Sequence, residues 1–303
     1  ECYVIFGTAV GFPSGFDVDS LDGTNGFRLD GAMANDFSGS NVSTAGDVNG
    51  DGLDDILIAA PAADANGNLN SGETYVVFGS LNPFAASVDL SSLDGTNGFR
   101  ILGIGPDDGS GTSARNAGDV NGDGFDDLIL GSFGNFYNTT AGDEAYLVFG
   151  RSTFSATFQL SSLDGTNGLL LPGVLANDRF GTAVSSAGDV DGDGFDDLVI
   201  GASQSVSYTT EPGEAYIFYG GDLTGDVTHP GTDAADSLMG TAAADVIVAG
   251  QDNDSLYGAG GPDVMRAGQG DDLLMIGDAN FLRVDGGRGF DTLALGDFDL
   301  DLS

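Results

Sequence analysis

The sequence predicts an all-β protein built from two consecutive kinds of β repeat. Short segments of aromatic and β-branched residues recur about every 70 residues over the first two thirds of the chain. Aspartates then recur every nine residues in the last third. Glutamate, the helix-forming acid, is scarce, with 5 residues against 42 aspartates. We therefore expect strands and tight turns throughout and no long helix.

The charge of the chain excludes several classes of function. The 303 residues carry 47 acidic and 8 basic side chains, a formal net charge of −39. Such a chain does not bind nucleic acid through a basic patch, and no apolar run reaches the length that inserts into a membrane. One cysteine, Cys2, and one histidine, His229, are too few for an intrachain disulfide or a His/Cys zinc site. Abundant Asp and Gly instead favour carboxylate-lined loops that bind calcium.

The long repeat has three markers that keep one order. The strand-like segment YVIFG at Tyr3 returns as YVVFG, YLVFG and YIFYG at Tyr75, Tyr146 and Tyr216, with spacings of 72, 71 and 70 residues. The second marker, LDGTNG, predicts a hairpin turn rather than a further cation site. About four short strands per unit predict blades of a β-propeller over residues 1–220. Three units are too few to close a ring, so we expect a partial propeller that is incomplete at its N-terminus.

The third marker is an aspartate loop that leads directly into an apolar strand. Its pattern, D-x-N/D-x-D-G-x-x-D, places oxygen ligands at alternate residues, and its glycine permits a sharp bend, which suits Ca²⁺. The predicted ligands, with the main-chain carbonyl in the fourth place of each copy, are Asp47, Asn49, Asp51, Leu53 and Asp55, then Asp119, Asn121, Asp123, Phe125 and Asp127, and then Asp189, Asp191, Asp193, Phe195 and Asp197. An EF-hand needs a glutamate at position 12, where this chain has Ile58, Leu130 and Ile200.

A nine-residue period begins after a predicted linker over residues 221–230. Each aspartate of this period is followed two positions later by an apolar residue, from Leu238 onward, and the register recovers late at Leu293. This pattern predicts a parallel β-roll over residues 231–303, incomplete at its C-terminus, in which the metal contributes much of the folding free energy. The predicted metal ligands are Asp236, Asp245, Asp254, Asp263, Asp272 and Asp291.

These motifs resemble two known families. The first 220 residues resemble FG-GAP repeats, the blades of integrin α-like propellers, through AGDVNGDGxDD and the Phe180–Gly181 pair. The tail resembles hemolysin-type (RTX) nonapeptides, with its best copies in GAGGPDVM, AGQGDDLL and GGRGFDTL, whereas GTDAADSL and GTAAADVI lack the fourth-position glycine. The resemblance implies several bound Ca²⁺ ions and a secreted or cell-surface location, reached in bacteria by type I export.

The function that these observations favour is a non-enzymatic calcium-binding module of a larger bacterial secreted or surface protein. Calcium would fold it, and the blades would contact a cell-surface protein or glycan in adhesion. No nucleophile elbow is present, and the paired carboxylates that a glycosidase requires fall in the cation loops. Two alternatives stay open: an accessory, non-catalytic region of an exported hydrolase, and a structural spacer.

Overall fold

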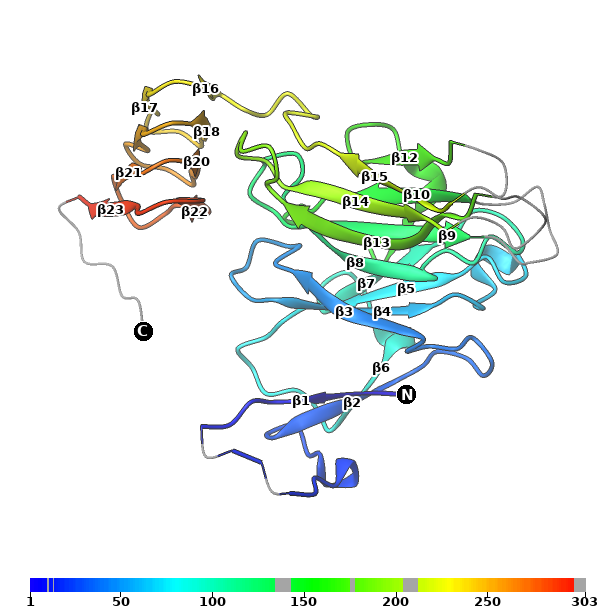
Figure 1. The fold of residues 1–303 in the computed structure, drawn as a ribbon. Helices are drawn as coiled ribbons and strands as arrows, with labels where there is room; N and C mark the ends of the chain where they lie inside the picture. The colour runs from blue at the N-terminus through cyan, green and yellow to red at the C-terminus, as the bar shows by residue number, and fades with distance from the viewer. Residues whose placement is uncertain (10, 13, 134–142, 175–177, 204–211, 297–303) are drawn as a thin grey trace.

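The computed structural model describes residues 1–9, 11–12, 14–133, 143–174, 178–203 and 212–296. Within these residues the chain forms β-strands and four 3₁₀ turns of three residues each, which confirms the all-β prediction. Figure 1 shows the strands of the first part as sheets stacked side by side, with the last part as a separate narrow coil at one end of the stack.

The strands fall into six sheets. The strands of the stacked sheets are β1 (Cys2–Ile5), β2 (Gly26–Asp30), β3 (Asn41–Gly46), β4 (Asp55–Ala60), β5 (Glu73–Val77), β6 (Ser87–Asp89), β7 (Gly98–Leu102), β8 (Ser113–Gly118), β9 (Asp127–Phe133), β10 (Asp143–Val148), β11 (Thr157–Gln159), β12 (Gly168–Pro172), β13 (Phe180–Gly188), β14 (Asp197–Ala202) and β15 (Glu214–Phe218). The 3₁₀ turns are η1 (Val18–Ser20), η2 (Ala65–Gly67), η3 (Leu90–Ser92) and η4 (Leu160–Ser162).

Two of these sheets contain the complete antiparallel set expected of a propeller blade. Their strand orders are β3-β4-β5-β7 and β8-β9-β10-β12. The sheet β13-β14-β15 repeats the first three positions, and the pair β1-β2 repeats the last two. The blade architecture predicted from the 70-residue period is thus what the strands form.

The LDGTNG segment is a turn, but it does not close a hairpin. In its first copy the amide of Thr24 donates to Asp22 Oδ1 at 2.9 Å, and the amide of Asp22 donates to Asn25 Oδ1 at 3.1 Å. The strands on either side of the second copy belong to different sheets, since β6 pairs in parallel with β2 and β7 pairs with β5. The hairpin prediction is wrong because the segment carries the chain from one blade to the next.

The core of the stack lies between neighbouring sheets. Leu57, Val76 and Phe99 of one blade pack against Leu128 and Tyr146 of the next, and all five side chains are buried. Successive side chains of a strand point to opposite faces of its sheet. Because the two complete blades have a neighbouring sheet on both faces, their strands are apolar at consecutive positions, as in the runs that lead out of the first two aspartate loops.

The last part of the chain is a parallel coil. Its strands are β16 (His229–Thr232), β17 (Ser237–Met239), β18 (Val246–Gln251), β19 (Ser255–Tyr257), β20 (Val264–Gln269), β21 (Leu273–Ile276), β22 (Arg283–Asp285) and β23 (Thr292–Leu295). Even-numbered and odd-numbered strands form two separate sheets of four strands. Ile247 pairs with His229 and with Met265, so one coil takes 18 residues, which is two nonapeptides.

The apolar position of the nonapeptide faces the core of this roll, except at its end. Ile247, Leu256, Met265 and Leu274 are buried together. Leu293 pairs with Leu274 along the sheet but remains 47% exposed, because it lies on the last coil of the described chain. We expected Leu293 to play the same part as the earlier apolar residues. This expectation is wrong, because the side chain of Leu293 is not buried in the core of the roll.

Candidate metal centres

The three aspartate loops occupy equivalent places, each between the first and second strands of its sheet. In Figure 1 they lie along the side of the stack that faces the roll, at the strand ends. The glycine after the third predicted ligand has a positive φ in every copy, at 84°, 93° and 90° for Gly52, Gly124 and Gly194. A side chain is strained in this conformation, so glycine permits the bend that the pattern predicts.

The first aspartate of each loop is held by the main chain of its own loop. Asp47 accepts hydrogen bonds from the amides of Asp51 and Gly52, at 3.0 and 2.8 Å. Asp119 accepts them from Gly122 and Gly124, at 2.7 and 2.8 Å. These bonds wrap the backbone around the carboxylate and set the curvature of the loop.

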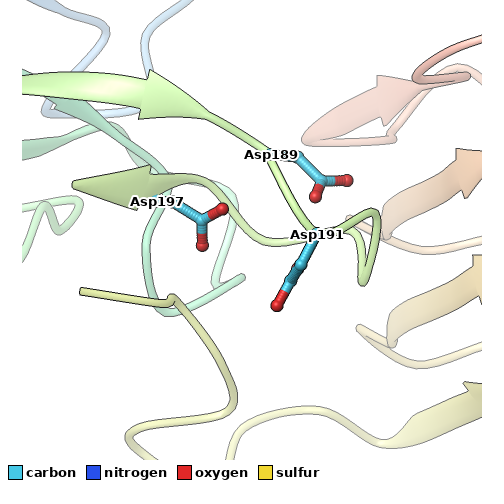
Figure 2. Close-up of side chains that lie close together, drawn as sticks. All are labelled: Asp189, Asp191 and Asp197. Atoms are coloured by element: carbon cyan, nitrogen blue, oxygen red, sulfur yellow. The ribbon is translucent and has the colours of Figure 1, made fainter. Parts of the chain in front are cut away.

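The third loop brings three carboxylates together. Oxygen atoms of Asp189, Asp191 and Asp197 lie within 4.8 Å of one another, and Figure 2 shows their side chains around the bend of the loop. Asp193 is not in this group, and its carboxylate accepts the amide of Phe195 at 3.0 Å. Within the described residues this is the one group of three acidic side chains whose oxygen atoms lie this close together.

The first two loops carry an asparagine where the third carries Asp191, and this changes their internal bonds. The side-chain amide of Asn49 donates to Asp51 Oδ2 at 3.1 Å. Asn121 donates to Asp123 Oδ2 at 3.0 Å in the same way. An amide donor offsets part of the repulsion among the acidic groups, and the third loop has a carboxylate in its place.

Burial raises the pKa of several loop carboxylates. The pKa of Asp55 and that of Asp123 rise to about 7, mainly because each carboxylate is removed from water, with repulsion from neighbouring aspartates adding to the effect. The pKa of Asp193 rises to about 6 for the same reasons. Such carboxylates are costly to ionise unless a cation is present.

The last aspartate of each loop has a structural role that the sequence pattern did not show. Asp55 accepts the amides of Val48 and Gly79, at 3.1 and 2.8 Å, and so ties the loop to the end of the third strand. The same pair of bonds is made by Asp127 with Val120 and Gly150 and by Asp197 with Val190 and Gly220. These glycines follow the YVVFG-type strands, which explains why the two markers recur together.

The aspartate directly before the last aspartate of a loop is a second residue whose role the sequence analysis did not predict. The amide of Asp47 donates to Asp126 Oδ2 at 2.9 Å, and the amide of Asp119 donates to Asp196 Oδ2 at 2.8 Å. Each of these carboxylates belongs to the next blade. The repeated Asp-Asp pair was the sequence signal for this role. The second aspartate of the pair accepts amides of its own blade, and the first accepts an amide of the loop in the preceding blade.

In the roll, the nonapeptide aspartates form a ladder. The amide of Asp236 donates to Asp254 Oδ1 at 2.7 Å, the amide of Asp254 donates to Asp272 Oδ1 at 2.7 Å, and that of Asp272 donates to Asp291 Oδ1 at 3.0 Å. On the other side of the roll, the amide of Asp245 donates to Asp263 Oδ1 at 3.0 Å. The structure thus places the six predicted aspartates in two columns, one on each side of the roll.

The early and the later coils of the roll differ in the hydrogen-bond partner of the second carboxylate oxygen, Oδ2, of these aspartates. Thr232 donates through its hydroxyl to Asp236 Oδ2 at 2.8 Å, and Thr241 donates to Asp245 Oδ2 at 2.9 Å. Asp254 Oδ2 and Asp272 Oδ2 are buried and accept no hydrogen bond. The two threonines stand in the turns that lack the fourth-position glycine, and sequence analysis did not single them out.

This arrangement fits a hard divalent cation. A buried carboxylate oxygen without a partner is costly, and a cation removes that cost. In the roll, Asp254 and Asp272 would hold calcium. In the third blade loop, Asp189, Asp191 and Asp197 would hold it. The main-chain carbonyls of Leu53, Phe125 and Phe195 are ligands predicted from the sequence, and they remain predictions.

Comparison with known families agrees with this geometry. The model of the FG-GAP repeat matches residues 38–77 and 180–218. The model of the RTX calcium-binding nonapeptide repeat matches residues 230–265 and 250–278. The chain carries FG-GAP repeats followed by RTX calcium-binding repeats. The middle blade shares the loop and the strand order of the two matched FG-GAP repeats.

The chain is similar to animal integrin α chains. It is 31% identical over 173 residues to integrin alpha-PS5 of Drosophila melanogaster, which covers 57% of this chain and 15% of that protein. It is 27% identical over 208 residues to integrin alpha-PS2 of the same organism, covering 65% of this chain and 14% of that protein. Phosphatidylinositol-glycan-specific phospholipase D of Dictyostelium discoideum is 27% identical over 214 residues, covering 66% of this chain and 22% of that enzyme. The chain therefore spans a small part of the curated relatives it matches.

These findings establish the general character of the chain. It is a calcium-binding repeat module, and its repeat families point to an extracellular or surface protein. The matched repeat families and the integrin relatives are not catalytic. The part of the chain that the structure describes has no helix with the length and hydrophobicity needed to cross a membrane.

Proposed function

We propose that this chain is a calcium-folded adhesion module of a larger bacterial protein that is secreted or displayed on the surface by type I export. Calcium fills the blade loops and the roll, and the stacked blades present a binding surface to a cell-surface protein or a glycan. The module itself has no catalytic role. The proposed domains are the blades over 1–220 and the roll over 231–303, joined by residues 221–230, although the first strand of the roll, β16, already begins at His229 within this predicted linker.

The convergence of carboxylates without a balancing charge is the observation that carries this proposal. Three acidic side chains meet in the third loop, and two carboxylate oxygens are buried without partners in the roll. Among the described residues none of these carboxylates forms a salt bridge, and the chain has only 8 arginines against 47 acids. A divalent cation supplies the missing charge and closes each loop at once.

The energetic consequence is that folding depends on calcium concentration. At free calcium tenfold above the dissociation constant, one independent site adds about 1.4 kcal/mol to the free energy of unfolding. Several sites together equal the stability of a small domain, which is about 5–15 kcal/mol. In a calcium-poor cytoplasm the chain would stay loosely folded, which suits export, and it would fold in a calcium-rich exterior.

Circular dichroism with thermal melting tests the proposal. Spectra and melts are recorded in EDTA and across a calcium titration, with magnesium as the control cation. We expect a calcium-specific gain of β signal and a melting temperature that rises with calcium concentration. Identical melts in EDTA and calcium would overturn calcium-coupled folding and leave the structural-spacer alternative.

Adhesion is tested separately, with the folded protein in calcium buffer. Binding to immobilised cell-surface proteins and to a glycan array is measured with calcium and with EDTA. The proposal expects saturable binding that EDTA abolishes. Calcium-dependent folding without binding to either surface would favour the spacer.

The accessory-region alternative has one observation in its favour. The similarity to a phospholipase D covers 66% of this chain but only 22% of that enzyme. A region of this kind can accompany a hydrolase without taking part in its chemistry. If this alternative holds, the chain has no phospholipase activity of its own, and joining it to a hydrolase domain changes where that enzyme binds rather than its turnover.

A further inference from the structure

The roll and the middle aspartate loop are joined by a buried arginine. Arg266 of β20 is 147 residues away from Asp119 in sequence, yet its Nη2 donates to Asp119 Oδ2 at 2.8 Å. The side chains of Arg266 and Asp119 are 5% and 0% exposed. Arg266 Nη1 also donates to the carbonyl of Gly194 in the third loop, at 3.0 Å. One guanidinium thus spans two loops of neighbouring blades.

A second arginine of the roll reinforces this contact. Arg283 Nη1 donates to Asp126 Oδ1 at 2.9 Å and lies 3.9 Å from Asp119 Oδ2. The space around these pairs is closed, since a Cβ on Gly124 would lie 2.5 Å from Val264 Cγ2 and 3.1 Å from Leu282 Cδ2. The middle loop is therefore covered by the roll, and its first aspartate, Asp119, pairs with an arginine of the roll.

Within the described residues, the first aspartate of each of the other two loops lacks such a partner, although Asp196 of the third loop lies 4.0 Å from Arg266 Nη2. The first aspartates there, Asp47 and Asp189, form no salt bridge. Arg288 approaches the third loop at 3.0 Å, but it binds the main-chain carbonyl of Asp189 rather than a carboxylate. Three loops of nearly identical sequence are thus unequal, and the inequality comes from the roll.

We infer that Arg266 is a built-in competitor of calcium at the middle loop, so that docking of the roll and filling of this loop oppose each other. This inference rests on the proposed function, because it needs calcium in the blade loops. The guanidinium partly neutralises Asp119, a predicted first ligand, and its positive charge repels a divalent ion. Even with the dielectric screening of bulk water, a unit charge about 6 Å from a divalent ion weakens its binding by about tenfold.

The consequence is a fixed order of filling. The first loop and the roll take calcium first. Arg266 also contacts the third loop, but through the Gly194 carbonyl and Asp196 rather than through a predicted ligand, so the middle loop, whose first aspartate is paired, fills last. Because coupling between two binding events is reciprocal, calcium in the middle loop weakens the docking of the roll by the same factor. The protein then has a docked state at moderate calcium and a looser one at high calcium.

Three glycine amides report on the three loops separately. The amides of Gly52, Gly124 and Gly194 each donate to the Oδ2 of the first aspartate in their own loop, at 2.8, 2.8 and 3.1 Å. Their NMR resonances are followed in the full chain during a calcium titration. In the wild-type protein we expect the Gly124 midpoint to lie at a calcium concentration about tenfold above the other two.

Variants at Arg266 test the cause of that difference. Arg266→Met removes the charge at similar length and lowers the Gly124 midpoint by about tenfold, whereas Arg266→Lys keeps the charge and leaves the midpoint high. Arg283→Met acts in the same direction but less, since its closest nitrogen is farther from Asp119. Arg28→Met is the matched control, because Arg28 pairs with Asp30 on the exposed surface.

The possible outcomes are distinct. The inference is overturned if Gly124 responds together with or before Gly52 and Gly194 in the wild-type protein, or if Arg266→Met leaves its midpoint unchanged. The expected fall holds whether or not the roll of Arg266→Met stays docked, because the charge is gone in either case. If none of the three amides responds to calcium, the proposed function of the blade loops fails as well.

Discussion

The main-chain amide of Asp119 donates to the carboxylate of Asp196 at 2.8 Å, so an aspartate of one blade caps the metal loop of the blade before it. The same bond joins Asp47 to Asp126 at 2.9 Å. The loops are therefore linked in series across the stack. A change in one loop reaches its neighbour through a single hydrogen bond.

Asp196→Ala tests this link. It leaves the amide of Asp119 without its acceptor in a buried site, which costs about 1–3 kcal/mol of the free energy of unfolding. Urea unfolding in calcium buffer measures the loss. Asp54→Ala is the control, because Asp54 is the equivalent residue of the first loop and is exposed. Equal effects of the two variants would argue against the link.

The third loop is predicted to hold one calcium ion. Asp189→Ala combined with Asp193→Ala should lower the number of bound ions by about one and leave the other loops filled. Isothermal titration calorimetry and metal analysis after dialysis give the count. The exposed pair Asp233→Ala and Asp94→Ala is the control for a loss of two charges. An unchanged stoichiometry would refute the assignment of this loop.

Two pairs of roll aspartates should differ in their effect. Asp254→Asn with Asp272→Asn replaces the oxygens that are buried without a partner, so the roll should lose calcium and need more calcium to fold. Asp236→Asn with Asp245→Asn should have a much smaller effect, because threonine hydroxyls already occupy those oxygens. Calcium titration followed by circular dichroism compares the pairs. Equal shifts would show that the threonine bonds do not matter.

The apo protein should gain stability as the solution becomes more acidic. The pKa values of Asp55 and Asp123 rise to about 7 in the folded chain, and those of Asp193 and Asp263 to about 6, chiefly because burial disfavours the charged form. The folded chain then binds more protons than the unfolded chain between pH about 4 and 7, so stability falls as pH rises through this range. Calorimetry in EDTA should give a higher melting temperature at pH 5.5 than at pH 8.

Calcium should reverse this dependence. A cation binds the ionised carboxylates, so its affinity falls as pH decreases below about 7, the pKa of Asp55 and Asp123. In saturating calcium the melting temperature should therefore be higher at pH 8 than at pH 5.5. A melting temperature that depends on pH in the same way with calcium and with EDTA would contradict the assignment of these carboxylates to cation sites.

The sequence by itself determined the repeat architecture. The 70-residue period with its four strand-like segments and the nine-residue period with its apolar partner both describe contacts between neighbouring repeats. Such contacts are local in a repeat protein, so periodicity is sufficient to infer them. The aspartate loops could be predicted for the same reason, since each predicted loop, such as the run from Asp189 to Asp197, lies within nine consecutive residues.

Only the tertiary structure decided which carboxylates are free to meet a cation. Asp55, Asp127 and Asp197 resemble ordinary ligands in the sequence, yet each also accepts two main-chain amides. Asp236 and Asp254 occupy the same position of the nonapeptide, but the hydroxyl of Thr232 reaches only the first. The pairing of Arg266 with Asp119 joins different kinds of repeat, and no period relates the two residues. Such contacts depend on how the two parts pack, which is why periodicity does not reveal them.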